Sequence, residues 1–126
     1  MTTATLQAER FEIPDDIWAA QAFFEEKGWS DGLPIIPPTE ERVGQMLAAT
    51  KRKPDEVIGA VPPRWAQATV EKIAINGVMA GCKPEYMPVL IAAVEALTDP
   101  KLNLYALQAT TGGPAVMIIV NGPAPI

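Results

Sequence analysis

The stretch Asn76-Gly77-Val78-Met79-Ala80-Gly81-Cys82-Lys83-Pro84-Glu85-Tyr86-Met87-Pro88 joins two apolar, alanine-rich segments and decides the fold of this chain. Apolar residues across 69–80 recur at the spacing of one helix face. Gly81 ends this helix, because glycine readily adopts the left-handed conformation found after many helices. Pro84 and Pro88 fit only before or within a first helical turn. A second helix therefore begins between them and runs to Leu97.

Cys82 is the only cysteine, and it falls in the tight link just before the second helix. The partial positive charge at a helix N-terminus and the neighbouring Lys83 both favour a thiolate. Glu85 adds a carboxylate and Tyr86 a phenol. We predict Cys82, Lys83 and Glu85 as candidate catalytic residues and Tyr86 as a substrate contact. The alternative is that Cys82 is a small buried residue that fills a helix–helix corner.

Composition excludes several classes of protein. Apolar residues make up 48% of the 126 residues and charged residues 20%, which is ordinary for one folded domain. The net charge of −5 argues against nucleic acid as a partner. No apolar run approaches a membrane span, and the N-terminus does not have the pattern of a signal peptide. We expect a cytoplasmic protein of the bacterial type.

The chain contains no histidine. It therefore cannot complete a Ser-His or Cys-His nucleophile pair, or a Cys/His zinc site, from its own residues. Any general base must be Asp, Glu, Lys, Tyr or Cys, or must come from another chain. We predict no metal site in this chain, and the sequence points to no particular cofactor.

Before the central stretch, the pattern alternates between helices and extended segments. Residues 1–12 are expected to form a flexible arm, and Asp15-Asp16 to open a helix that Gly28 ends. Residues 33–38 must be extended, because each proline disfavours a helical conformation in the residue before it. Thr39 is the expected N-cap of a helix reaching Lys53, whose basic run 51–53 would complement the helix dipole.

Two polar residues in this half are candidate substrate contacts. Asp31 lies in the Ser-Asp-Gly turn after Trp29, where it either holds the turn through backbone amides or faces a ligand. Residues 56–61 form a short expected strand, after which Arg64 and Trp65 lead into the helix that ends near Cys82. Arg64 either stacks on Trp65 or binds a carboxylate or phosphate.

After Pro100 the pattern favours strands. Residues 104–111 show partial alternation, and residues 116–120 are apolar throughout, which is typical of a strand buried on both faces. Thr110-Thr111-Gly112-Gly113-Pro114 lies between them. It is either a tight turn, which we favour, or an anion-binding nest with Thr110 and Thr111 as further donors.

These elements predict an α/β protein with about four helices and a small sheet, in a single domain over 13–126. The apolar strand 116–120 has no following element to bury it, so we expect another chain to complete the sheet.

Two long motifs carry a resemblance to a known family. They are residues 28–39, Gly-Trp-Ser-Asp-Gly-Leu-Pro-Ile-Ile-Pro-Pro-Thr, and residues 76–89, the central stretch with Val89. Together with 108–111 and 119–123 they resemble an uncharacterised bacterial protein family typically encoded beside UGSC-type (seleno)proteins. The resemblance covers nearly the whole chain from Gly28. It implies that this chain corresponds to the N-terminal part of the family, but it implies no activity residue by residue.

The chain departs from the family pattern at two places. Many family members have a histidine and a proline after the paired threonines, where this chain has Gly112 and Gly113. Members commonly continue well beyond the Asn-Gly-Pro stretch at 121–123. Both departures favour a split, processed or naturally short form whose site and sheet need another polypeptide.

We therefore expect one subunit of a heteromeric enzyme acting on a small polar substrate, with a thiol-based or carboxylate-based site around Cys82 and Glu85. Redox, lyase and hydrolase chemistry all remain open. The alternatives are a non-catalytic structural subunit and a ligand-binding subunit, each with Cys82 buried. A homo-oligomer is the second possibility for the assembly.

Overall fold

In the computed structural model, which describes residues 6–122, the chain is a mixed α/β structure. Within this range it contains five helices, four of them with at least seven residues, and a two-stranded antiparallel sheet. The α/β prediction, with about four helices and a small sheet, is confirmed. Residues 1–5 of the predicted arm and the predicted domain end at 123–126 lie outside the described residues.

Three helices around the central stretch form the body. They are α2 (Glu40–Ala48), α3 (Val70–Met79) and α4 (Met87–Thr98), and the short 3-10 turn η1 (Pro84–Tyr86) leads into α4. Gly81 has φ +76°, so the left-handed helix end predicted there is confirmed. The side chains of these helices pack into one core cluster of Val43, Met46, Val70, Ile73, Ala74, Val78, Met87 and Ile91.

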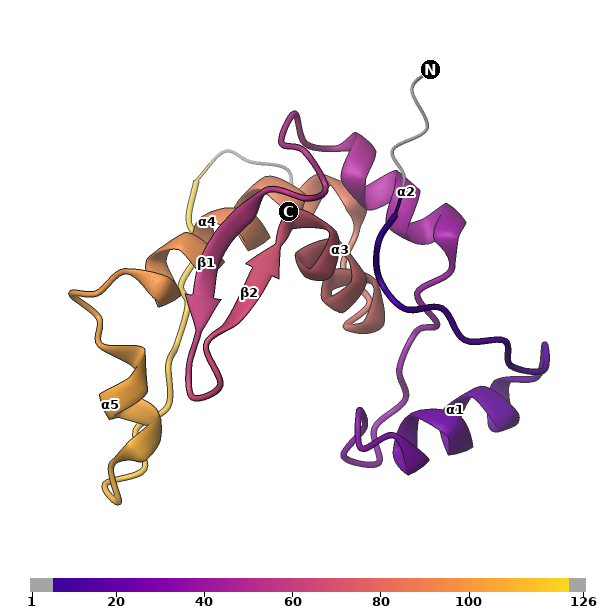
Figure 1. The fold of residues 1–126 in the computed structure, drawn as a ribbon, viewed down its shortest axis with the longest axis horizontal. Helices are drawn as coiled ribbons and strands as arrows, with labels where there is room; N and C mark the ends of the chain where they lie inside the picture. The colour runs from indigo at the N-terminus through magenta and orange to yellow at the C-terminus, as the bar shows by residue number, and fades with distance from the viewer. Residues whose placement is uncertain (1–5, 123–126) are drawn as a thin grey trace.

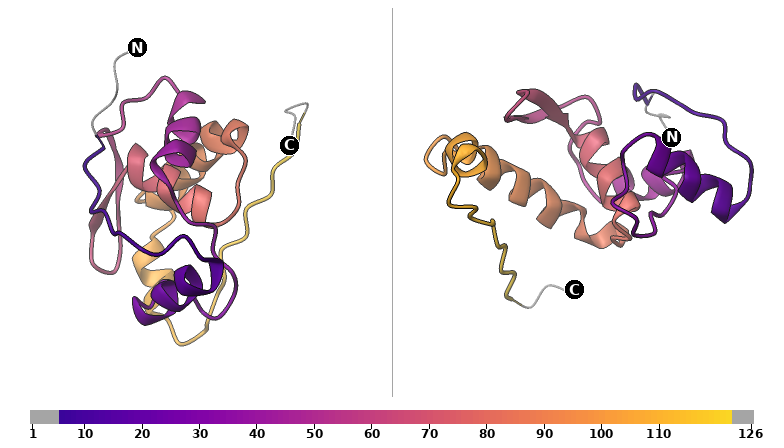
Figure 2. Two further views of the ribbon diagram at one scale, coloured as in Figure 1. Left: turned by 90° about the vertical axis from the view of Figure 1, so that its right-hand side faces the viewer. Right: turned by 90° about the horizontal axis from the view of Figure 1, so that it is seen from below.

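A β-hairpin packs on α4. Strand β1 (Val57–Val61) confirms the predicted strand at 56–61, and it pairs with β2 (Ala66–Thr69) in the register Val61 to Ala66. The strand at residues 66–69 was not predicted, because Arg64 and Trp65 were expected to lead directly into the helix at 69–80. The pairing of this strand with β1 is a tertiary contact that no local sequence pattern announces. The hairpin lies on one side of α4 and the C-terminal segment on the other (Figure 2).

Two lobes extend from the body (Figure 1). One holds α1 (Ile17–Glu26) and the other α5 (Leu104–Ala109). The extended segment 33–38 is a strap between α1 and the body. Gln21 brackets it by donating to the Ile35 carbonyl oxygen at 2.8 Å and accepting from the Ile35 N–H at 3.0 Å. The Ile36 N–H donates to the Met79 carbonyl at the end of α3.

Both strands predicted after Pro100 are wrong. Residues 104–109 form helix α5, because Asn103 caps it by accepting from the Ala106 N–H and the following Leu, Ala and Gln favour helix. Residues 116–120 are extended, but they pair with no strand among the described residues and are all exposed. The apolar pattern indicates that these residues are suited to burial, but no strand within residues 6–122 pairs with them.

Helix α2 ends earlier than expected, at Ala48. The basic run 51–53 therefore does not complement its last turn. Arg52 instead forms ion pairs with Glu56 at 2.9 Å and with Glu95 of α4 at 2.7 Å, which ties the loop before β1 to α4.

Candidate functional site

Cys82 lies in the link between α3 and η1. Its N–H donates to the Gly77 carbonyl at 2.9 Å, so the end of α3 fixes its position. Cys82 is half-buried and packs against the core cluster. Neither Lys83, the N-cap of η1, nor Tyr86, the N-cap of α4, makes a side-chain capping hydrogen bond. The link thus presents a partly accessible thiol beside a helix start without a side-chain cap.

The residues that flank Cys82 differ in exposure. Lys83 and Glu85 are exposed, and neither forms an ion pair within residues 6–122. Tyr86 is half-buried. The four predicted residues of this link are near one another because they are neighbours in sequence. Cys82 packs against the core, as expected if it is a structural residue that fills a helix–helix corner.

The other predicted site residues lie on three separate loops. Asp31 is exposed and accepts from the Leu33 N–H at 3.2 Å, so it holds its own turn. Arg64 is exposed at the hairpin turn, where Trp65 packs on Tyr105 with ring centroids 5.7 Å apart. Asp31 also lines an open hollow that reaches Gly81, next to Cys82.

Thr110 and Thr111 follow α5 and are exposed. The Gly112 N–H donates to the Thr110 hydroxyl at 3.3 Å, and the Gly113 N–H donates to the Thr110 carbonyl at 3.4 Å. The favoured prediction of a tight turn is therefore confirmed. Both glycine N–H groups donate within the turn, and the alternative of an anion nest with Thr110 and Thr111 stays a prediction.

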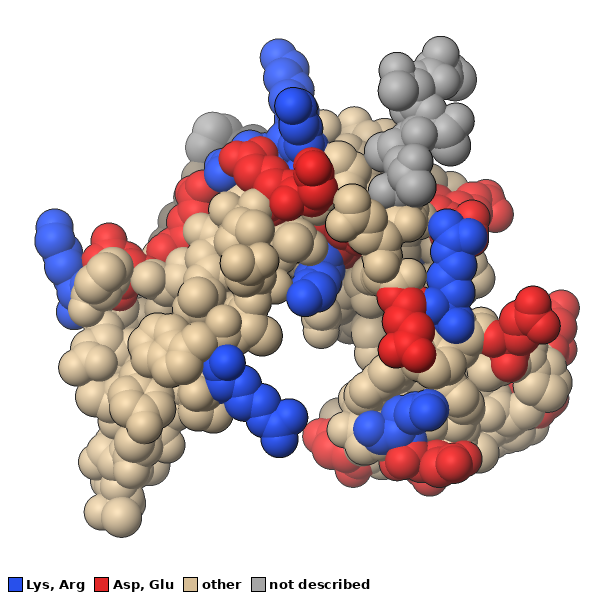
Figure 3. Space-filling model, in the orientation of Figure 1, with Lys and Arg blue, Asp and Glu red and all other residues tan. Residues whose placement is uncertain are grey.

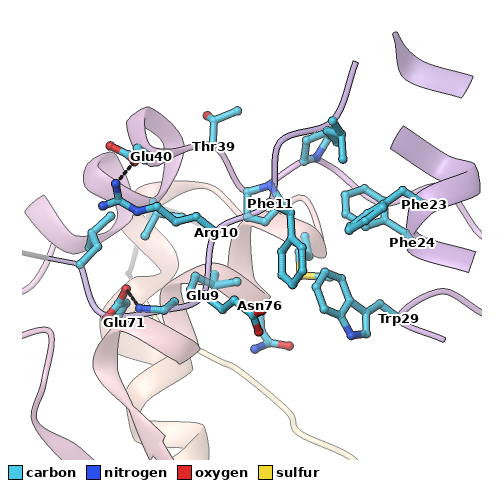
Figure 4. A pocket seen from close by; sticks show the side chains of 18 residues that line it. Glu9, Arg10, Phe11, Phe23, Phe24, Trp29, Thr39, Glu40, Glu71 and Asn76 are labelled. Carbon is cyan, nitrogen blue, oxygen red and sulfur yellow. Dashed lines mark hydrogen bonds and ion pairs between the residues drawn. The ribbon is translucent and has the colours of Figure 1, made fainter. Parts of the chain in front are cut away.

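A second concave region was not predicted from the sequence. A cavity of about 590 Å³ lies between the N-terminal segment 6–13, α1, the strap, α2 and α3 (Figure 4). One wall carries the chain's three phenylalanines, Phe11, Phe23 and Phe24, together with Trp29. Their gathering within residues 11–29 is a signal in the sequence that could have indicated this wall.

Glu71 fastens the N-terminal segment over this cavity. Its side chain is only 4% exposed, and its carboxylate accepts from the Gln7 and Ala8 N–H groups at 3.0 Å. Its position on the apolar face of α3, one turn before Ala74, could have indicated a buried and paired carboxylate. Arg10 and Glu40 add an exposed ion pair of 2.8 Å.

Within residues 6–122, no three His, Cys, Asp or Glu side chains gather in a way that could hold a metal ion. None of the helices described has the length and apolar character needed to cross a membrane.

Comparison with known proteins yields no relatives: the chain matches no protein-family model, no curated protein and no solved structure.

Proposed function

We propose that this chain is one subunit of a heteromeric enzyme and that a second polypeptide covers residues 102–122. The main support for an assembly of several chains is the exposure of the segment Val116 to Val120. Its five apolar side chains are 44% to 79% exposed, and the segment is extended with no partner strand among the described residues. An exposed, extended apolar segment of this kind is a template for pairing with another chain.

The accessible surface of the whole chain supports the same proposal. It measures 9221 Å², whereas a compact monomer of 13.5 kDa exposes about 6,500 Å². Two lobes of the described chain project from the body and enlarge its exposed surface (Figure 1). A partner that fills the space beside them would bring the exposed surface into the usual range.

The α5 lobe has the composition of an interface. No charged residue occurs between Lys101 and Gly122, and the cores of protein interfaces are depleted in charge. In the space-filling view this lobe is almost free of charged side chains, whereas acidic side chains gather over α1 (Figure 3). The face offered to a partner is therefore the one that includes α5 and the segment after it.

The resemblance to a family encoded beside UGSC-type proteins favours a co-encoded polypeptide as the partner. The test is native mass spectrometry on the chain expressed alone and with the products of adjacent genes. We expect a defined complex on co-expression. A larger assembly of this chain alone would replace the heteromer with a homo-oligomer, and a stable, active 13.5 kDa monomer would contradict both.

The enzymatic part of the proposal assigns thiol or carboxylate chemistry on a small polar substrate to Cys82, Lys83 and Glu85. Its support is the partly accessible thiol next to a helix start without a side-chain cap. The test is the rate of alkylation of Cys82 against pH in the native complex. A catalytic thiolate reacts well below the ordinary thiol pKa of about 8.5. Reaction only near that pH would favour a structural Cys82.

A further inference from the structure

The cavity under the N-terminal segment has an aromatic wall that the chain leaves open. Phe11 contacts Phe23 and Trp29, with ring centroids 5.4 Å and 5.5 Å apart, and Phe24 lies 6.2 Å from Trp29. In spite of these contacts, Trp29 remains 45% exposed and Phe11 39% exposed. A flat apolar molecule in the cavity would bury more of these rings. The volume of about 590 Å³ is in the range of small-molecule sites.

The charged side chains that line the cavity are mostly acidic. Glu9, Glu40 and Glu71 contribute carboxylates, and Arg10 is the basic residue among the lining side chains (Figure 4). Arg10 already pairs with Glu40, and the Glu71 oxygens accept backbone N–H groups. Glu9 forms no ion pair within residues 6–122, so its carboxylate is available to a ligand.

A lysine of the chain already lies over two of the aromatic rings of this wall. The Lys27 ammonium lies 5.1 Å from the centroid of Phe11 and 5.5 Å from that of Phe23, which is cation–π distance. Lys27 occupies these faces of Phe11 and Phe23, so the attraction for the amine of a ligand comes from the unpaired Glu9 carboxylate, which also disfavours an anion. The net charge of the chain, −5, acts in the same direction.

We propose that this cavity binds a small planar, apolar molecule of one or two rings that carries a cationic amine, with the rings against Trp29 and Phe11 and the amine at Glu9. The site is separate from Cys82 and does not depend on the proposed subunit role. The N-terminal segment, latched by Glu71, forms one side of the cavity and retains the bound molecule.

Three probes with one ring system test the ligand class. They are naphthylmethylamine, naphthalenemethanol and naphthoate, titrated into the full chain by isothermal calorimetry. We expect the amine to bind most tightly, the alcohol less tightly and the carboxylate least. Saturable binding by none of the three would overturn the proposal, as would a carboxylate that binds as tightly as the amine.

Variants then locate the binding. Trp29→Ala should weaken amine binding at least about fivefold, because it removes a stacking surface. Trp65→Ala is the matched control, since Trp65 is an exposed tryptophan that packs on Tyr105 outside the cavity, and it should leave binding unchanged. An equal loss in both variants would contradict the assignment.

Glu9→Gln decides the question even where Trp29→Ala does not fold, because Glu9 is exposed. It should reduce the advantage of the amine over the alcohol by up to about fivefold and leave alcohol binding unchanged. An advantage that stays the same in this variant would place the amine elsewhere and overturn the proposal.

Discussion

Gly59 in β1 lies so close to Thr98 at the end of α4 that a Cβ atom at position 59 would stand 2.6 Å from the Thr98 Cβ. The Thr98 hydroxyl donates to the Val94 carbonyl at 2.8 Å, which holds its side chain in one rotamer. The hairpin can therefore dock on α4 only because residue 59 has no side chain.

Replacing Gly59 with alanine should destabilise the chain. The added methyl group must push β1 away from α4, and overpacking of this kind costs about 1–3 kcal/mol. The free energy of unfolding in urea measures the effect. Gly44→Ala is the control, because no atom lies within 4 Å of its added Cβ and the residue is in helix α2. That variant should gain about 0.5–1 kcal/mol. Equal effects of both variants would contradict the contact.

Glu71→Gln should loosen the N-terminal segment. A glutamine offers one neutral oxygen in place of a carboxylate that now accepts from two backbone N–H groups, and its own amide adds donors beside them. Amide exchange at Gln7 and Ala8 should therefore accelerate, and trypsin should cleave faster after Arg10. Glu40→Gln removes only an exposed ion pair, so its effect on stability should stay within about 1 kcal/mol. Exchange rates at Gln7 and Ala8 that do not change in Glu71→Gln would refute the latch.

The ion pair between Arg52 and Glu56 should make the local stability of the chain depend on pH. The hydrogen bond from the Arg52 side chain lowers the pKa of Glu56 below its ordinary value of 4.5. Because the pKa is lowered in the folded chain, the stabilisation is present above the ordinary pKa and is lost as the pH falls through the lowered one. Arg52→Gln should raise the Glu56 pKa, as measured by NMR titration of its carboxyl carbon. Lys53→Gln should raise it less, since Lys53 is a smaller cause. An unchanged pKa in Arg52→Gln would contradict the pairing.

Local signals predicted the parts of the fold that short-range chemistry decides. Thr39 accepts from the Arg42 N–H as the cap of α2, and Gly81 takes the left-handed conformation that ends α3. Both depend on neighbours within four residues. Strand β2 and helix α5 were missed for different reasons. The pairing of β2 with β1 is non-local. Residues 104–111 show the partial alternation of a strand, but the N-cap at Asn103 starts a helix there.

The sequence was less informative about sites, because a site depends on which loops meet. Cys82 and Glu85 were chosen for their chemical types, and the structure places them on a link between helices and outside the aromatic cavity. The contact between Phe11 and Trp29 was not predicted, since they are 18 positions apart in the chain and meet only through the fold of the N-terminal segment. A pattern within one helix or strand cannot report a contact of that kind.

The last prediction concerns Ile118, in the middle of the exposed apolar segment. Ile118→Asp should prevent association with the partner chain, because a carboxylate would have to be buried without a counter-charge in the new interface. The thermal midpoint of the isolated chain should not change, since Ile118 is 55% exposed there. Ile17→Asp provides the matched control. Ile17 is 56% exposed, and aspartate suits its place at the start of α1, so assembly should survive. Light scattering of each variant, alone and with the co-expressed partner, measures both outcomes. Assembly that persists in Ile118→Asp would show that the partner binds elsewhere.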